Sequence, residues 1–316
     1  MGRPPGSTGF TWVTHPRHLP APPDGRVVVV DVAFAAGQQF QGKTLPFIRA
    51  LGPRLLCWVD HHLHRDGWAH VSDDPRFVLV PNRVAHACPQ LVTVELVQRV
   101  ERGDPVDQVV AHADFDGLVA AVKWRRGGVQ PWAEADEDAC AVDSPGRGHS
   151  LSERGARLAY ALEEASGRYS LTRRAELLGE VAASLVAEQE SADLRHLLDE
   201  LASAGRLVED DARRLAERSG REEAPGVFVV RLQTPVENRV RKHLLMMAEE
   251  RAPIGALFEP DPKGGAWVTA ATFDERLDLE EVSGFAGGRS DYRFARAKDD
   301  GRSNIAALGR YLDEQL

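Results

Sequence analysis

The sequence predicts an α/β protein with a doubly wound parallel sheet, a helical connector and a smaller C-terminal α/β domain. Three observations favour this class. Short apolar runs alternate with helix-like segments in the first half of the chain, as in parallel sheets. Several of these runs end in Asp or His. From about residue 150, apolar residues recur at three- and four-residue steps, which indicates helices.

Composition limits the classes of protein to consider. The 316 residues exceed one ordinary domain, and 43% hydrophobic with 28% charged residues is typical of folded chains. A net charge of −9 disfavours binding of long duplex DNA, so anionic ligands must be held locally. Three scattered cysteines predict a reducing, cytoplasmic location. Without an apolar stretch of about 18 residues, we expect no membrane partner.

The first half of the chain contains the predicted parallel sheet. Residues 1–25 are rich in Pro and Gly, which predicts a flexible N-terminal arm, and residues 26–149 form the α/β domain. Its predicted strands are residues 26–31, 54–59 and 77–80, with 106–111 as a strand or a buried turn; its helices are residues 43–51 and 88–100. Because ligands bind beyond the carboxyl ends of parallel strands, polar residues there are expected to converge.

The second half is predicted as a helical connector over residues 150–219 and a substrate-binding domain over residues 227–316. The leucines of the connector indicate either core packing or the face of a homodimer. Residues 220–226 are interpreted as a linker. In the last domain we expect strands at residues 227–230, 254–258 and 266–272 around a helix at residues 238–251.

The acidic and histidine residues after the strands match the needs of a two-metal centre. Two divalent ions about 3.5 to 4 Å apart require a bridging carboxylate, further carboxylates and imidazoles. The sequence supplies these side chains as Asp31, Asp60, His61, His62, His112, Asp114 and Asp116. The alternation in residues 112–116 suits a loop leaving a strand, and Gly117 allows a tight turn into the next helix.

These motifs resemble those of the DHH phosphoesterase family over roughly residues 25–145. Residues 59–62 (VDHH) match the motif that names the family, and residues 112–117 (HADFDG) match its HxDxDG motif. Asp31 follows an apolar strand, as in the strand-end aspartate motif of the family. The HxDxDG motif normally comes first, whereas here it comes last, so the sequence looks circularly permuted. Strand ends converge in a parallel sheet whatever their order along the chain.

The resemblance implies an enzyme. It implies a metal-dependent phosphoesterase that hydrolyses phosphodiester or phosphate bonds in small nucleotides or short single-stranded oligonucleotides, through a hydroxide shared by two metal ions. Oxygen-rich ligation with imidazoles favours Mn²⁺. The implied ligands are His112 and Asp114 on one ion, His61 and Asp116 on the other, Asp31 as the bridge, and Asp143 as a further ligand.

Two more roles follow from the resemblance for the residues around the ligands. Asp60 would orient an imidazole, and His62 would contact the substrate phosphate or assist the leaving group. Residues 284–289 (GFAGGR) resemble the glycine-rich substrate loop of the family, although Arg289 replaces the histidine that follows the glycines there. The implied substrate-binding residues are Gly287, Gly288, Arg289, Arg293 and Arg296.

Simpler interpretations of several residues stay open. Asp31 alone is compatible with a helix N-cap, and Asp143 in Asp-Ser-Pro-Gly with a turn. The pair Gly287-Gly288 fits a turn as well as a phosphate loop. For function, one alternative is a pyrophosphatase or polyphosphatase, and another is a non-catalytic nucleotide sensor that retains the fold. His64, His70, His86 and His149 are interpreted as surface or packing residues.

Overall fold

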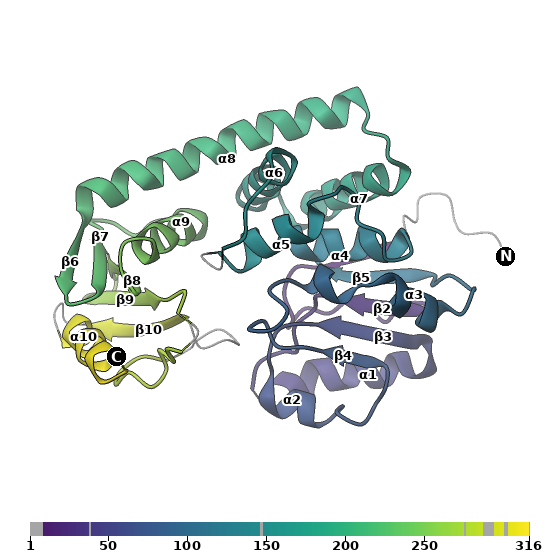
Figure 1. Ribbon diagram of the computed structural model, residues 1–316, viewed down its shortest axis with the longest axis horizontal. Helices are drawn as coiled ribbons and strands as arrows, with labels where there is room; N and C mark the ends of the chain where they lie inside the picture. The colour runs from purple at the N-terminus through teal and green to yellow at the C-terminus, as the bar shows by residue number, and fades with distance from the viewer. Residues whose placement is uncertain are drawn as a thin grey trace. The chain divides into compact units, whose positions relative to one another are not determined.

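The computed structural model describes residues 9–37, 39–145, 148–274, 276–286, 294–299 and 303–315. The chain divides into two compact units: the first comprises residues 1–144 and 149–203, and the second comprises residues 145–148 and 204–316. Helix α8 (Ala192–Ser219) runs from the first into the second, as Figure 1 shows.

The first unit is built on a five-stranded parallel sheet with the order β1-β5-β2-β3-β4. Its strands are β1 (Phe10–Val13), β2 (Val27–Val30), β3 (Leu55–Asp60), β4 (Phe77–Leu79) and β5 (Gln108–His112). The central strand β2 is a run of four valines, all buried. Such a continuous apolar run is typical of a strand that is covered on both faces.

Helices cover both faces of this sheet, which confirms the doubly wound α/β class. One face packs against α3 (Val94–Glu101) and α4 (Phe115–Arg125). The other face packs against a π-helix at Phe40–Thr44 and α1 (Leu45–Leu51). The remaining short elements are α2 (Arg65–Ala69), α5 (Ala135–Asp143) and two 3₁₀ helices, Gly52–Arg54 and Cys88–Leu91.

The leucine-rich segment forms α6 (Glu153–Arg168), α7 (Leu171–Ala187) and the first half of α8. Its leucines from Leu158 to Leu201, apart from the exposed Leu171, pack in one core cluster with residues of α4 and α5. This segment therefore belongs largely to the first unit, and the periodic pattern reflects core packing. Among the described residues, no helix is both long enough and apolar enough to cross a membrane.

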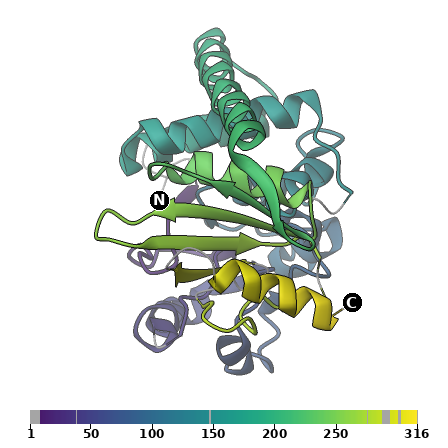
Figure 2. The same cartoon turned by 90° about the vertical axis from the view of Figure 1, so that its left-hand side faces the viewer.

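The second unit has a mixed five-stranded sheet with the order β10-β9-β8-β7-β6. Only β7 and β8 pair in parallel; the other pairs are antiparallel. Helix α9 packs on one face, and α10 packs on the other, seen in yellow in Figure 2. The elements are β6 (Gly220–Ala224), β7 (Val227–Arg231), α9 (Asn238–Glu249), β8 (Ile254–Pro260), β9 (Ala266–Ala271), β10 (Phe294–Asp299) and α10 (Ser303–Gln315).

Three segments differ from the expectation. The helix predicted over residues 88–100 is interrupted, because a 3₁₀ helix at Cys88–Leu91 precedes α3, which begins after the N-cap Thr93. Part of the predicted arm forms β1, which pairs with β5 at the edge of the first sheet. Part of the predicted linker forms β6, the edge strand of the second sheet. Its charged residues led to the interpretation as a linker, but an edge strand tolerates charges such as Glu222 and Glu223. Both are short edge strands, which have weak sequence signals.

Candidate metal centre

The polar residues of the three sequence motifs converge at the carboxyl ends of neighbouring strands. Asp31 follows β2, Asp60 ends β3 and His112 ends β5. Strands β3 and β5 flank β2 on either side, so these ends lie next to one another although 81 residues separate Asp31 from His112. The unusual order of the motifs along the chain does not affect this convergence.

Asp31 lies at the middle of the convergence. It has a φ of 58°, a left-handed conformation that is rare for a residue other than glycine, and its N–H donates to the Val59 carbonyl at 2.9 Å. Its side chain is fully buried, and neither carboxylate oxygen has a hydrogen-bond partner among the described residues. Burial and the carboxylates of Asp116 and Asp114 raise its pKa well above the usual range.

One group of potential ligands comprises Asp31, His112 and Asp114. Asp31 Oδ2 lies 3.8 Å from His112 Nδ1, which also contacts Asp114 Oδ2. Asp114 is the N-cap of α4 and accepts from the Gly117 N–H at 3.3 Å, which fixes its position at the start of the helix. Burial opposes the charge on His112, but the Asp114 carboxylate outweighs it and raises the pKa of His112 to about 9.

A second group comprises His61, Asp116 and Asp143. His61 Nε2 lies 3.4 Å from Asp31 Oδ1 and 3.5 Å from both Asp116 Oδ2 and Asp143 Oδ2. Burial lowers the pKa of His61, yet the carboxylates of Asp116 and Asp143 raise it well above its ordinary value. Asp143 is the last residue of α5, so its side chain reaches this group from a helix end.

The other ring nitrogen of His61 is held by the backbone. His61 Nδ1 lies 3.0 Å from the Ala85 carbonyl oxygen. A carbonyl only accepts, so Nδ1 carries the proton and Nε2 is the atom that faces the three carboxylates. This outer contact is typical of histidines that bind metal through the opposite nitrogen.

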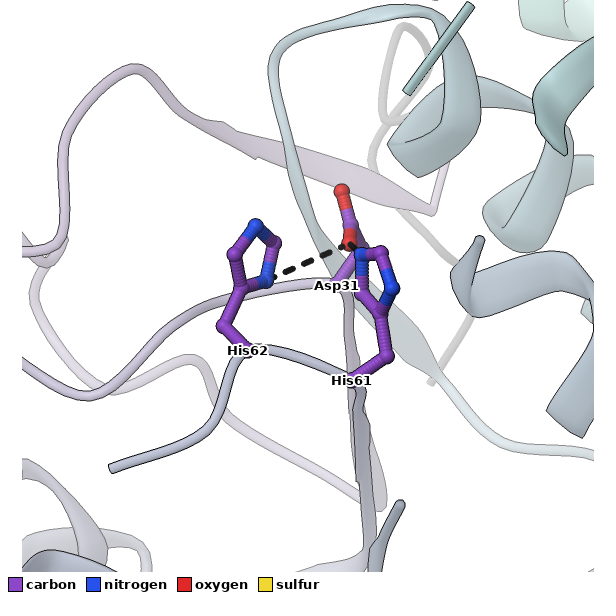
Figure 3. A group of neighbouring side chains, drawn as sticks. All are labelled: Asp31, His61 and His62. Atoms are coloured by element: carbon purple, nitrogen blue, oxygen red, sulfur yellow. Dashed lines mark ion pairs between the residues drawn. The ribbon is translucent and has the colours of Figure 1, made fainter. Parts of the chain in front are cut away.

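His62 forms a third group with Asp31 and His61. Figure 3 shows both imidazoles directed towards the Asp31 carboxylate. His62 Nδ1 lies 2.9 Å from Asp60 Oδ1, and 3.8 Å from Asp31 Oδ1. Asp60 is fully buried, whereas the His62 side chain is 28% exposed. The geometry therefore orients the His62 ring and leaves part of it open to solvent.

The centre, defined here as Asp31, Asp60, His61, His62, His112, Asp114, Asp116 and Asp143, fits divalent cations. Both oxygens of Asp31 and Nε2 of His61 are buried without a hydrogen-bond partner among the described residues. Such orphaned polar atoms are costly in a protein interior unless an ion or water satisfies them. Five carboxylates and three imidazoles are a donor set suited to Mn²⁺.

The fold and the centre were compared with known proteins. No model of a protein family matches the chain, and no curated protein matches its sequence. One similar solved structure is the pGpG-specific phosphodiesterase PggH of Vibrio cholerae, with 11% identity, a TM-score of 0.47, and coverage of 92% of this chain and 98% of that one. Another is an exopolyphosphatase-related protein of Bacteroides fragilis, with 9% identity, a TM-score of 0.37, and coverage of 91% and 71%.

The parallel sheet and the convergence of the three motifs at its carboxyl edge agree with the expectations from the sequence. The roles that the resemblance gives to the single residues stay predictions, but the structure brings all eight of the catalytic and metal-binding candidates together.

The predicted substrate loop is mostly outside the described residues. Gly287, Gly288, Arg289 and Arg293 all lie there. Arg296 is described, on β10, where its backbone pairs with Ala286 through hydrogen bonds of 3.0 and 3.1 Å. Its guanidinium carbon lies 4.3 Å from the centroid of the Trp267 ring. Its role in substrate binding stays a prediction.

Sequence reasoning missed several contacts that surround the centre. His86 Nδ1 lies 2.5 Å from His149 Nε2, and His149 Nδ1 lies 3.0 Å from Glu137 Oε2. The Ser144 hydroxyl donates to the His86 carbonyl at 2.7 Å. These contacts join the segment behind His61 to the end of α5, and no spacing pattern in the sequence indicated them. Arg174 of α7, which donates to the Ala113 carbonyl, was also missed.

Replacing Gly117 by alanine is expected to damage the centre. A Cβ at this position would lie 2.4 Å from the His112 carbonyl oxygen, 2.9 Å from Asp114 Oδ1 and 3.0 Å from Asp31 Oδ2. The loop must shift to relieve these clashes, so we expect Gly117→Ala to lower the free energy of unfolding by about 1 to 3 kcal/mol. A displacement of about 1 Å would also reduce turnover roughly 10²-fold.

Chemical denaturation and phosphodiester hydrolysis measure the two effects. Gly42→Ala is the matched control, because a Cβ at Gly42 meets nothing within 4 Å. Wild-type stability and wild-type turnover in Gly117→Ala would show that the close approach at this glycine has no importance for the centre.

Proposed function

We propose that the chain is a divalent-metal-dependent phosphoesterase that hydrolyses phosphodiester or phosphate bonds in small nucleotides or short oligonucleotides. The observation that supports this best is the Asp31 carboxylate. It is buried and unpartnered, and its two oxygens face different ligand groups, Oδ1 towards His61 and Oδ2 towards His112. A carboxylate in this position suits a bridge between two cations.

We infer that His112 and Asp114 hold one ion and that His61, Asp116 and Asp143 hold the other, with Asp31 shared. When bound, two such ions supply a hydroxide nucleophile at neutral pH and stabilise negative charge on phosphate oxygens. Mn²⁺ is the ion that we expect, because imidazoles and carboxylates occur together in both groups.

The side chains of the chain itself have further roles in this proposal. Asp60 accepts from His62 Nδ1 and fixes its ring, so that Nε2 points away from Asp60. Because His62 is partly exposed, a substrate can reach this nitrogen. His62 would donate a hydrogen bond to a phosphate oxygen or a proton to the leaving oxygen. The buried surroundings of Asp31 and His61 strengthen each charge interaction in the centre.

The negative net charge of the chain favours small substrates over long polyanions. Its net charge of −9 gives no general attraction for a polyanion, so binding must depend on the centre and on a few nearby cations. We also infer a reducing, cytoplasmic location from the three buried cysteines, Cys57, Cys88 and Cys140, which are all free.

Asp114→Ala tests the proposal. We expect wild type with Mn²⁺ to hydrolyse bis-p-nitrophenyl phosphate and at least one short oligonucleotide or cyclic dinucleotide, and the chelated protein to be inactive. The variant should lose about 10²- to 10³-fold in turnover. Thr93→Ala is the control, because Thr93 is also a helix N-cap, accepting from Leu96 N at 3.2 Å, but lies outside the centre. Equal losses in both variants would assign the effect to capping.

The same assay separates the alternative functions. Faster turnover of inorganic pyrophosphate or polyphosphate than of any dinucleotide would favour a pyrophosphatase or polyphosphatase. Nucleotide binding without hydrolysis under Mn²⁺, Mg²⁺, Co²⁺ or Fe²⁺ would favour a sensor and contradict the proposed function.

A further inference from the structure

Arg174 brings a positive charge to the centre from a distant part of the sequence. It lies on α7, and its Nη2 donates a hydrogen bond to the carbonyl of Ala113, between the ligand candidates His112 and Asp114. The side chain is partly buried. No spacing relation links it to the motifs, since 60 residues separate Asp114 from Arg174.

Most N–H donors of the Arg174 guanidinium have no partner among the described residues. Arginine carries five N–H donors. Among the described residues, the Arg174 side chain donates one hydrogen bond, to the Ala113 carbonyl. Within the described ranges, Arg174 forms no ion pair with a carboxylate. The Asp114 carboxylate acts on it only through its field, which raises the pKa of Arg174, whereas burial lowers it more. A desolvated cation of this kind requires an anionic partner.

The charges of the centre indicate what that partner is. Five aspartates, Asp31, Asp60, Asp114, Asp116 and Asp143, gather there, so two divalent cations leave one negative charge over. A phosphate ester adds at least one more. A further cation next to the ions offsets this charge, and the forked donors of arginine match phosphate oxygens.

The structure assigns Arg174 as a phosphate-binding residue: we propose that its free N–H donors bind a phosphate group of the substrate beside the His112–Asp114 end of the centre. The proposal rests on the proposed function and deepens it, because it predicts a substrate with a phosphate at this place. Two phosphates share the required chemistry, the one that is cleaved and a neighbouring one such as a 5′-phosphate. The bond to Ala113 keeps the guanidinium in place for either.

The test compares Arg174→Met and Arg174→Lys with a matched control on the same helix. The Arg173 side chain is 40% exposed and is already paired with Glu176 at 3.3 Å and Glu180 at 3.1 Å, so Arg173→Met removes an arginine that has partners. The probes are inorganic phosphate, a dinucleotide with a 5′-phosphate and the same dinucleotide without it. Calorimetry measures binding of the probes and of Mn²⁺, and steady-state kinetics measure kcat and KM.

We expect Arg174→Met to weaken binding of inorganic phosphate and of the phosphorylated dinucleotide by about 10- to 100-fold. Mn²⁺ affinity should stay within about twofold of wild type, and Arg174→Lys should lie between wild type and the methionine variant. A loss restricted to the 5′-phosphorylated dinucleotide would place Arg174 on the neighbouring phosphate. An equal loss for both dinucleotides, with Mn²⁺ affinity retained, would place it on the cleaved one.

Two results would overturn the assignment. Unchanged phosphate binding in Arg174→Met would do so, and so would a parallel loss of Mn²⁺ affinity and of all probes, which would reduce Arg174 to a support for the Ala113 loop. Failure of the proposed function has a different signature. In that case wild type hydrolyses no probe, while phosphate binding still depends on Arg174 and not on Arg173.

Discussion

Asp31→Asn is expected to abolish most of the hydrolysis while making the metal-free protein more stable. The amide cannot bridge two cations as a carboxylate does, so turnover should fall on the order of 10³-fold, equivalent to about 4 kcal/mol in the barrier. With a chelator present, the same change removes a fully buried charge that faces the carboxylates of Asp116 and Asp114. The free energy of unfolding at pH 8 should therefore rise relative to wild type.

The prediction is specific because Asp31→Asn should lower turnover and raise the stability of the metal-free protein. Loss of activity is measured with bis-p-nitrophenyl phosphate and Mn²⁺, and stability is measured by chemical denaturation in EDTA. Asp73→Asn, at an exposed position, should change neither quantity. A variant that keeps full turnover would contradict the bridging role. A variant that is less stable than wild type in EDTA would show that the Asp31 carboxyl is not under electrostatic strain.

Withdrawal of the metal is expected to destabilise the protein, and more so as the pH rises. A bound ion stabilises the folded state by about 4 kcal/mol when its free concentration is 1,000 times its Kd. Without ions, His61 and His112 have pKa values raised above their ordinary value, to about 9 for His112. The folded state then binds more protons than the unfolded state, so the histidines' contribution is complete below about pH 6.5. It is lost as the pH rises towards 9.

The carboxyl groups of the centre also change how the stability of the metal-free protein depends on pH. The raised pKa values of Asp31 and Asp116 act in the same direction, because both carboxyls hold protons more tightly when folded. The lowered pKa of Asp114 opposes them only near its own acidic range. Denaturation curves from pH 6 to 9, in EDTA and in Mn²⁺, measure the difference. Equal stability in both solutions at pH 9 would argue against any ion in the centre.

Much of the fold was predictable because its signals are local. The valines of β2 and the apolar residues of β3 mark buried strands, and the leucines of α6 and α7 recur with helical period. The polar residues at the ends of β2, β3 and β5 could be assigned to one site, since parallel strands place their carboxyl ends together. The edge strands β1 and β6 were misinterpreted, because short runs among Pro, Gly or charged residues carry little periodicity, and β10 and α10 were not predicted.

The parts of the site that escaped prediction depend on tertiary structure. Arg174 reaches the Ala113 carbonyl only because α7 packs against α4, and the sequence around it looks like an ordinary charged helix. The Ala85 carbonyl, which holds His61, is a backbone atom that has no sequence signal at all. Asp143 was ambiguous between ligand and turn, and its distance of 3.5 Å from His61 Nε2 comes from the position of α5.

The edge strand β1 has a consequence for the order in which the protein assembles during synthesis. In the sheet β1 pairs with β5 alone, and Phe10 is paired with Val109 about 100 residues later. At about 5 to 20 residues per second, the ribosome needs roughly 5 to 20 s to make this partner. The Val13 carbonyl also accepts from the Ala113 N–H at 2.8 Å, next to His112 and Asp114. Of the five strands of this sheet, β1 is thus made first but cannot pair until β5, the last of them, has been made, and its pairing adds the Val13 carbonyl to the backbone around the centre.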